Sequence, residues 1–321
     1  MSESTAVARP PEPDWQTITA EELVAYRDAE NRFRALGAAR AITGEPDPGA
    51  TIQWETVALP GRELPVRVYR PEAGADRGGL PLVIHVHGGG FVGTAVQCDW
   101  GTSHLAARLP AVVVSVEHRL LAHDSPLSAA ADDGWDVLQH VVRHAGRWGI
   151  DPARTAVFGE SCGGLISALT ALRARDAGLH LAAQVLVNPA VDVTDTLLDY
   201  DSATAYAHTP TLGLPQLRLF QRLAVPAGTD PRALSPLYAD DLKGLAPALV
   251  VVPTDDPLAD HGRHYAERLQ AAGTPARLSE YPGAPHAFLA LPGIVPQAEP
   301  ALAEILDFLR VSLNSGQDQQ T

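Results

Sequence analysis

The stretch that decides the fold is Gly159-Glu160-Ser161-Cys162-Gly163, which matches the pattern Gly-x-Ser-x-Gly. It stands between a strand-like segment, Thr155–Phe158, and a helix-like segment, Gly163–Ala174. A sharp strand-to-helix turn needs small residues on either side of the serine and lifts the serine hydroxyl above the sheet edge. The first amides of the helix also point toward any anion that forms there. The pattern favours a nucleophilic serine, although a Gly-rich turn without chemistry fits it equally well.

Strand-like and helix-like segments alternate around this turn from Leu80 onward. The strand-like segments are Leu82–Val86, Val112–Val116, Thr155–Phe158, Val185–Val187, Ala248–Val252 and Arg277–Tyr281, preceded by Thr51–Leu59 and Leu64–Arg70. The helix-like segments are a stretch around His104–Leu109, then Ser128–His144, Gly163–Ala174, Asp260–Ala271 and a C-terminal stretch with an apolar stripe. Strands that alternate with crossover helices predict an α/β protein whose mostly parallel sheet is covered on both faces.

A second glycine-rich loop, His87-Gly88-Gly89-Gly90-Phe91, directly follows the strand Leu82–Val86. Glycines let the backbone approach a substrate closely and direct several N–H groups at one oxygen atom. A flexible loop is the simpler interpretation. Because the carboxyl ends of parallel strands share one sheet edge, we expect this loop to lie beside Ser161.

A nucleophilic serine needs a base, and the base needs an orienting carboxylate. Asp255 and Asp256 follow the strand Ala248–Val252, and His286 follows the last strand. The chain order Ser161, Asp256, His286 is the order that the α/β-hydrolase scaffold uses. We therefore predict a catalytic triad whose acid is one of these two adjacent aspartates.

The chain from about residue 80 to its end resembles the hormone-sensitive-lipase family, also called the bacterial family IV esterases. The motifs that carry the resemblance are HGGGF at 87–91, GESCGG at 159–164, DPL at 256–258 and HAF at 286–288. The resemblance implies an α/β-hydrolase fold with a helical cap. It also implies that Ser161 is the nucleophile, His286 the base and Asp256 its orienting acid. Gly88, Gly89 and the amide of Cys162 would then form the oxyanion hole.

Three features depart from the family pattern. Glu160 replaces the commoner aspartate, and Cys162 replaces the usual alanine, so its sulfur narrows the space beside the nucleophile and is open to oxidation. A small buried apolar residue is the simpler interpretation of Cys162. Residues 117–126 are a degraded form of the family's YRLAPE segment, which builds a wall of the site.

The expected organisation has four parts. Residues 1–50 form an N-terminal tail and cap helices, 51–194 and 233–321 the two parts of the core, and 195–232 a cap insertion punctuated by prolines. Thr19-Ala20-Glu21-Glu22 has capping-box spacing and starts a helix that ends near Gly37. We expect an apolar stripe of Leu23, Tyr26 and Phe33 on this helix to pack against the insertion and roof the pocket.

Composition limits the classes of partner. The net charge of −14 disfavours nucleic acid and anionic membrane surfaces, and the chain carries only Cys98 and Cys162 as cysteines. Neither a signal peptide nor an apolar run long enough for a membrane span is recognisable. We expect a cytoplasmic enzyme that acts on a small-molecule ester and needs no metal or organic cofactor. The sequence is compatible with either a monomer or a homodimer.

Other readings of the sequence compete with a carboxylesterase for small to medium acyl esters. The same triad would serve an acyltransferase or a deacylase of a secondary metabolite, and a non-catalytic binding module is disfavoured because His286 is present. The pairs His140/His144 and His261/His264 have helical spacing for a metal, but with no third ligand in the pattern a solvated helix face is the expectation for both.

Overall fold

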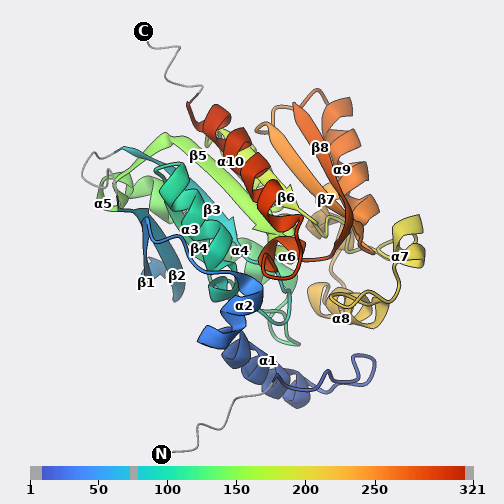
Figure 1. Ribbon diagram of the computed structural model, residues 1–321. Helices are drawn as coiled ribbons and strands as arrows, with labels where there is room; N and C mark the ends of the chain where they lie inside the picture. Colours follow the sequence, from blue (N-terminus) through green and yellow to red (C-terminus); the bar gives the residue numbers. More distant parts are fainter. Residues whose placement is uncertain (1–8, 73–78, 315–321) are drawn as a thin grey trace, which may run out of the picture.

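The computed structural model describes residues 9–72 and 79–314, and its centre is an eight-stranded sheet in the order β1-β2-β4-β3-β5-β6-β7-β8 (Figure 1). The strands are β1 (Ala50–Leu59), β2 (Arg62–Pro71), β3 (Leu80–Val86), β4 (Val112–Val116), β5 (Ile150–Glu160), β6 (Ala183–Val187), β7 (Ala248–Asp255) and β8 (Ala276–Pro285). β2 pairs antiparallel with β1 and β4, and the strands from β4 to β8 run parallel. The predicted mostly parallel α/β sheet is confirmed.

Helices cover the sheet on both faces. They are α1 (Ala20–Arg34), α2 (Arg40–Thr43), α3 (Asp99–Arg108), α4 (Leu127–Arg143), α5 (Ala145–Trp148), α6 (Cys162–Asp176), α7 (Asp201–Ala205), α8 (Leu214–Ala224), α9 (Ala259–Ala271) and α10 (Ala298–Asn314). The apolar cluster under α3 and α10 is separate from the one under α4, α6 and α8, as expected when a sheet buries both faces.

Two strands are longer than their apolar runs predicted. β5 begins at Ile150 rather than Thr155, and β8 continues to Pro285 rather than ending at Tyr281. The extra residues are mostly polar or half-exposed, and backbone pairing with β3 and β7 extends the strands beyond the apolar pattern. The end of β8 therefore runs directly to His286.

The N-terminal helix buries a charged side chain as well as part of the predicted apolar stripe. The Thr19 capping box is present, but only Leu23 and Glu30 of α1 are buried, while Tyr26 and Phe33 are half-buried. A buried carboxylate needs charged partners. Glu30 has them in Arg34 at 2.9 Å and Arg9 at 3.3 Å. Leu23 shares a core cluster with apolar residues of α8, and Tyr26 packs against that cluster, whereas Phe33 does not. Polar contacts therefore add to the predicted apolar ones in docking this helix.

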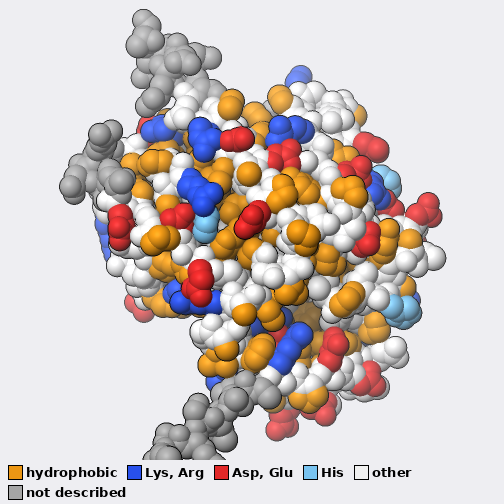
Figure 2. All heavy atoms as spheres, viewed as in Figure 1, with side chains coloured by type: hydrophobic (Ala, Val, Ile, Leu, Met, Phe, Trp, Pro, Cys, Tyr) orange, Lys and Arg blue, Asp and Glu red, His pale blue; other side chains and the backbone are white. Residues whose placement is uncertain are grey.

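The segment 195–232 folds into α7, α8 and short turns, and α1 and α8 lie at the same end of the sheet (Figure 1). On the face drawn in Figure 2, Lys and Arg side chains are interspersed among Asp and Glu. Within residues 9–72 and 79–314, no helix has both the length and the apolar character needed to cross a bilayer.

Candidate active site

Ser161 lies at a strained turn between β5 and α6. Its backbone φ of 54° and ψ of −118° are unusual for a residue with a side chain. The turn needs Gly163, because a Cβ there would lie 2.1 Å from the carbonyl oxygen of Val86. The turn that the Gly-x-Ser-x-Gly pattern predicts is therefore present, and it presents the Ser161 hydroxyl at the carboxyl edge of the sheet.

His286 connects Ser161 to a buried carboxylate. Its Nε2 lies 2.9 Å from Ser161 Oγ, and its Nδ1 lies 2.8 Å from Asp256 Oδ2. The other oxygen of Asp256 accepts the backbone N–H of Leu258 at 2.8 Å. Asp256 is fully buried and His286 nearly so, and these bonds fix the imidazole tautomer that has a free lone pair toward serine.

The structure separates the two adjacent aspartates. Asp255 is half-buried, and its carboxylate accepts the hydroxyl of Thr254 at 3.0 Å. It is the Asp256 carboxylate that reaches His286, because the backbone turns after β7.

The glycine loop lies beside the nucleophile. A Cβ built on Gly88 would lie 3.6 Å from Cβ of Ser161 and 3.2 Å from the carbonyl oxygen of Glu160. Gly89 has φ of +91°, and a Cβ there would lie 1.8 Å from Val92 O, so only glycine fits. Cys162 is the first residue of α6. The three predicted oxyanion residues thus border Ser161.

Helix α1 holds the outer part of this loop through a face that sequence reasoning missed. Arg27 donates to the carbonyl oxygens of Phe91 at 2.8 Å and Leu121 at 2.6 Å. Asn31 accepts the N–H of Gly93 at 2.9 Å and donates to the Gly93 carbonyl at 3.4 Å.

A third side chain of α1 reaches the inner part of the loop through an intermediate. Arg34 donates to Gln97 Oε1 at 2.7 Å, and Gln97 Nε2 donates to the carbonyl of Gly88 at 3.1 Å. Residues 27, 31 and 34 follow the spacing of one helix face. The available sequence signal was thus a polar stripe at four- and three-residue intervals, which a search for apolar stripes passes over.

Aromatic side chains from both flanking segments approach the loop. A Cβ on Gly90 would lie 2.7 Å from the ring of Phe220, which comes from α8. The ring centroid of Trp15 lies 5.3 Å from that of Phe91. Gln216 Nε2 of α8 donates to Glu12 Oε1 at 2.9 Å, so the segment before α1 touches α8.

Two buried histidines and a carboxylate lie behind the loop. The rings of His87 and His118 stack at 4.3 Å, and burial is the main cause that lowers the pKa of each imidazole. His87 Nδ1 donates to the Gly88 carbonyl at 2.9 Å. Burial raises the pKa of the Glu117 carboxyl to about 7, although it accepts the N–H of Ala95 at 2.8 Å. Below about pH 7 these groups therefore support the loop as neutral residues rather than as charges.

Cys162 is a buried apolar residue in this environment. Its side chain belongs to the core cluster under α4 and α6, and burial raises the pKa of its thiol to about 12. A thiol that stays protonated at neutral pH is a poor target for oxidation. The simpler of the two interpretations of Cys162 therefore fits the structure.

Of the histidine pairs, one differs from the expectation of a solvated helix. His261 is fully buried, its Nε2 lies 3.0 Å from the Leu197 carbonyl oxygen, and its ring lies 4.7 Å from that of Tyr200. The segment around residues 197–202 covers this end of α9, which the local sequence pattern does not reveal. His140 is half-buried and His144 is exposed, with ring centroids 4.3 Å apart.

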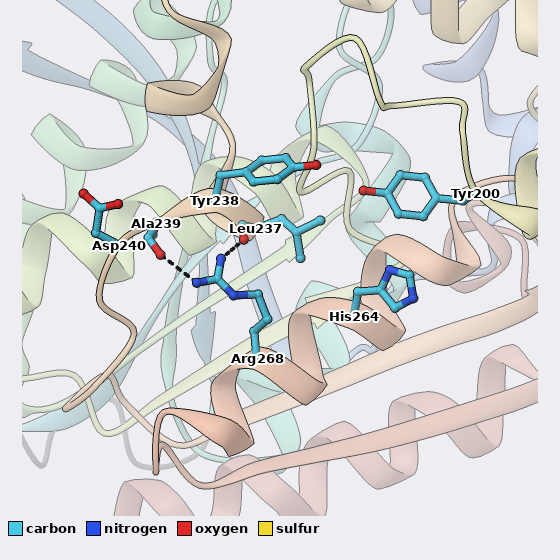
Figure 3. A pocket seen from close by; sticks show the side chains of 7 residues that line it. All are labelled: Tyr200, Leu237, Tyr238, Ala239, Asp240, His264 and Arg268. Atoms are coloured by element: carbon cyan, nitrogen blue, oxygen red, sulfur yellow. Dashed lines mark hydrogen bonds between the residues drawn. The ribbon is translucent and has the colours of Figure 1, made fainter.

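A separate surface pocket lies away from the triad, between α9 and the segment 237–240 (Figure 3). Its lining residues are Tyr200, Leu237, Tyr238, Ala239, Asp240, His264 and Arg268. Arg268 donates to the carbonyls of Leu237 and Ala239. The hydroxyls of Tyr200 and Tyr238 point toward each other in Figure 3 and bond to Asp192 and Thr196, respectively. The polar groups of Arg268, Tyr200 and Tyr238 are thus used within the protein.

Comparison with known proteins assigns the class. Residues 83–290 match the family model for the alpha/beta hydrolase fold. The chain is 36% identical to a carboxylesterase, NlhH, of Mycobacterium tuberculosis, over 98% of this chain and 100% of that protein. It is 33% identical to an ethyl acetate hydrolase of Pseudomonas putida, over 89% of this chain and 90% of that protein.

Solved structures agree with these relatives. The ester-hydrolase EH1AB1 from the metagenome of Lake Arreo superposes with a TM-score of 0.83 at 32% identity, covering 94% of this chain and 92% of that one. A hyperthermophilic esterase from Pyrobaculum calidifontis gives 0.80 at 31% identity, covering 90% and 93%. The chain belongs to the hormone-sensitive-lipase family of α/β-hydrolases. These relatives support carboxylic ester hydrolase activity for it.

Proposed function

We propose that this carboxylesterase hydrolyses small to medium acyl esters through a triad of Ser161, His286 and Asp256 and an acyl-enzyme intermediate. The observation that carries the proposal is the unbroken path from Ser161 Oγ through both nitrogens of His286 to Asp256, with contacts of 2.9 and 2.8 Å. Each group is within the distance that proton transfer requires.

The reaction begins when His286 Nε2 takes the proton of Ser161 as Oγ attacks the ester carbonyl carbon. The carbonyl oxygen becomes an oxyanion, which the amides of Gly88, Gly89 and Cys162 stabilise. Asp256 stabilises the imidazolium that forms. His286 then protonates the departing alcohol, and the acyl group stays on Ser161 as an ester. Water, deprotonated by His286, releases the acid by the same steps in reverse order.

The limit on acyl size rests on the roof of the site. Phe220 of α8 and Trp15 near α1 bring aromatic rings against the glycine loop from two sides. Rigid rings close to the oxyanion loop leave less room for a long chain than an open cleft would. The N-terminal segment and residues 195–232 would thus form the cap together.

Covalent trapping tests the proposal directly. A fluorophosphonate should phosphonylate Ser161, located by peptide mass spectrometry, and p-nitrophenyl esters of two to eight carbons should be turned over faster than those of twelve or more. The Ser161→Ala protein should take no label. A label on another residue would overturn the nucleophile assignment, and a rate that grows with chain length would overturn the size limit. Adding alcohols to the assay separates hydrolysis from acyl transfer, since a transferase would form the new ester.

A further inference from the structure

A second cluster of chemically active side chains lies directly behind the nucleophile and takes no part in the triad. His85 of β3, Cys98 at the start of α3 and Glu160 at the end of β5 are all buried, and their donor atoms lie within 4.8 Å of one another. His85 Nε2 and Cys98 Sγ each lie 3.6 Å from Glu160 Oε1. We refer to these residues as the His85 cluster.

The polar atoms of the His85 cluster are short of partners. His85 Nε2 makes no hydrogen bond within the described residues, although the side chain is fully buried. The Glu160 carboxylate accepts only the weak Cys98 thiol there. Buried polar groups are normally hydrogen-bonded, and an unpartnered one signals a missing water or ion. Both groups are oriented toward the same space.

The tautomer of His85 suits a ligand. Its Nδ1 lies 2.8 Å from Ser115 Oγ on β4. When Nδ1 donates its proton to that hydroxyl, Nε2 carries a lone pair aimed at Glu160. Packing against Phe158, whose ring centroid is 4.9 Å away, fixes the imidazole plane.

We propose that the His85 cluster binds one zinc-class divalent cation through His85 Nε2, Cys98 Sγ and a carboxylate oxygen of Glu160. Nitrogen, thiolate sulfur and carboxylate oxygen are the donors that Zn²⁺ takes, at about 2.0–2.3 Å. Tetrahedral ligands at those distances are separated by about 3.3–3.8 Å, and the two separations of 3.6 Å in this cluster match that spacing.

A small cavity of about 10 Å³ borders two of the three proposed ligands. Cys98 and Glu160 line it together with Phe158 and Leu289, and the half-buried residues Thr43, Gly101 and Ala290 border it. A water molecule there would complete four ligands, as in zinc sites with three protein donors.

Binding must release a proton. Burial and the neighbouring carboxylate of Glu160 raise the pKa of the Cys98 thiol well above its ordinary value. The thiol proton therefore leaves to solvent as the sulfur–metal bond forms, while Glu160 binds as a carboxylate and His85 as neutral imidazole. Affinity should rise with pH.

Cobalt is the probe, because thiolate-bound Co²⁺ absorbs in the near-ultraviolet and four-coordinate Co²⁺ absorbs strongly in the visible. The full chain, stripped of metal by a chelator, is titrated with Co²⁺ at pH 8. We expect one equivalent to bind with a thiolate-to-cobalt band, one proton to be released, and Zn²⁺ to bleach the band. The Cys98→Ser variant should lose the band, and His85→Gln should weaken binding at least tenfold, a loss of roughly the size that removing a metal-site partner causes.

Two matched variants serve as controls. Cys162→Ala removes the other buried thiol, and His144→Ala breaks the exposed histidine pair, so neither should change the band or the stoichiometry. A folded wild-type protein without a thiolate band, or a band that survives in Cys98→Ser, would overturn the site. If the variants do not fold, cadmium NMR of the wild-type chain decides. A shift typical of one sulfur donor supports the site, and one typical of oxygen and nitrogen donors alone refutes it.

Discussion

The two sides of Ser161 differ in how completely their buried polar groups are paired. On the triad side, Asp256 and His286 are joined at 2.8 Å, and the second carboxylate oxygen holds a backbone amide. On the loop side, which comprises residues 85–98 with Glu117 and Glu160, the closest histidine–carboxylate distance is the 3.6 Å between His85 Nε2 and Glu160 Oε1. A hydrogen-bonded carboxylate holds the imidazole in one orientation and tautomer, whereas a separated histidine–carboxylate pair leaves room for a further ligand. A histidine and a carboxylate therefore form a close hydrogen-bonded pair on one side of Ser161 and a separated pair on the other.

The largest expected effect is on the triad side. Ser161→Ala should lower kcat by about 10⁶, because the members of a triad act as a unit. The change deletes one hydroxyl, so the fold should persist, as circular dichroism can verify. Turnover that survives in a well-folded Ser161→Ala protein would place the nucleophile elsewhere.

The adjacent aspartates offer a matched pair on the same side. Asp256→Asn should cost about 10⁴ in kcat, since an amide favours the wrong imidazole tautomer. Asp255→Asn should cost no more than about threefold, as expected for a partly exposed side chain away from the histidine. Steady-state kinetics on both variants tests the ranking, and the reverse order would move the orienting carboxylate to Asp255.

A smaller effect is expected where α1 supports the loop side. Asn31→Ala removes both bonds to Gly93 and should lower kcat about tenfold, less than the loss of an oxyanion donor itself. KM should change little, because binding of the uncharged ester, before an oxyanion forms, does not depend on the exact position of the loop amides. Glu21→Ala, on the exposed side of the first turn of α1, is the control. Equal kcat values for the two variants would show that α1 only covers the surface.

The smallest expected effect is a gain in the free energy of unfolding when Glu117 is replaced, whereas the preceding substitutions all lower kcat. In the folded chain the pKa of Glu117 is about 7, above the ordinary carboxyl value of 4.5. Between these values the folded state binds the proton that the unfolded state has lost, so stability falls as pH rises and the loss is complete above about 7. Glu117→Gln should therefore stabilise the protein by about 1–3 kcal/mol at pH 8 and by almost nothing at pH 4.5.

Urea unfolding at the two pH values measures this difference. The wild-type protein at each pH is the reference. A Glu117→Gln protein that is less stable than wild type at pH 8 would mean that the carboxylate on the loop side is as well paired as Asp256, and the contrast between the two sides would not hold.

Local sequence was sufficient where a motif fixes the backbone. Gly163 is required by its distance to Val86 O, and the Gly-x-Ser-x-Gly pattern is specific for that reason. The strands before Ser161 and Asp256 were recognisable as apolar runs with β-branched residues, and the polar segment Arg277–Tyr281 before His286 was predicted as a last short strand. Their positions along the chain implied a shared sheet edge, and the structure brings all three side chains to it.

Local sequence was insufficient where a helix docks through polar groups. Arg27, Asn31 and Arg34 look like a solvated face, and only the position of α1 over the glycine loop gives them partners. His261 was misjudged for the same reason, since Tyr200 and Leu197 cover it from a distant segment. Burial of a polar residue depends on what packs over it, which periodicity does not encode.

The sequence by itself determined the fold class and the residues expected to carry the chemistry, because glycines, strand runs and motif order are local properties. Tertiary structure alone decided between Asp255 and Asp256, gave α1 its contacts with the loop, and brought His85, Cys98 and Glu160 together. Those three residues come from separate elements and form no motif. The physical reason is that distances between side chains on different elements are set by packing of the whole core, to which every layer contributes.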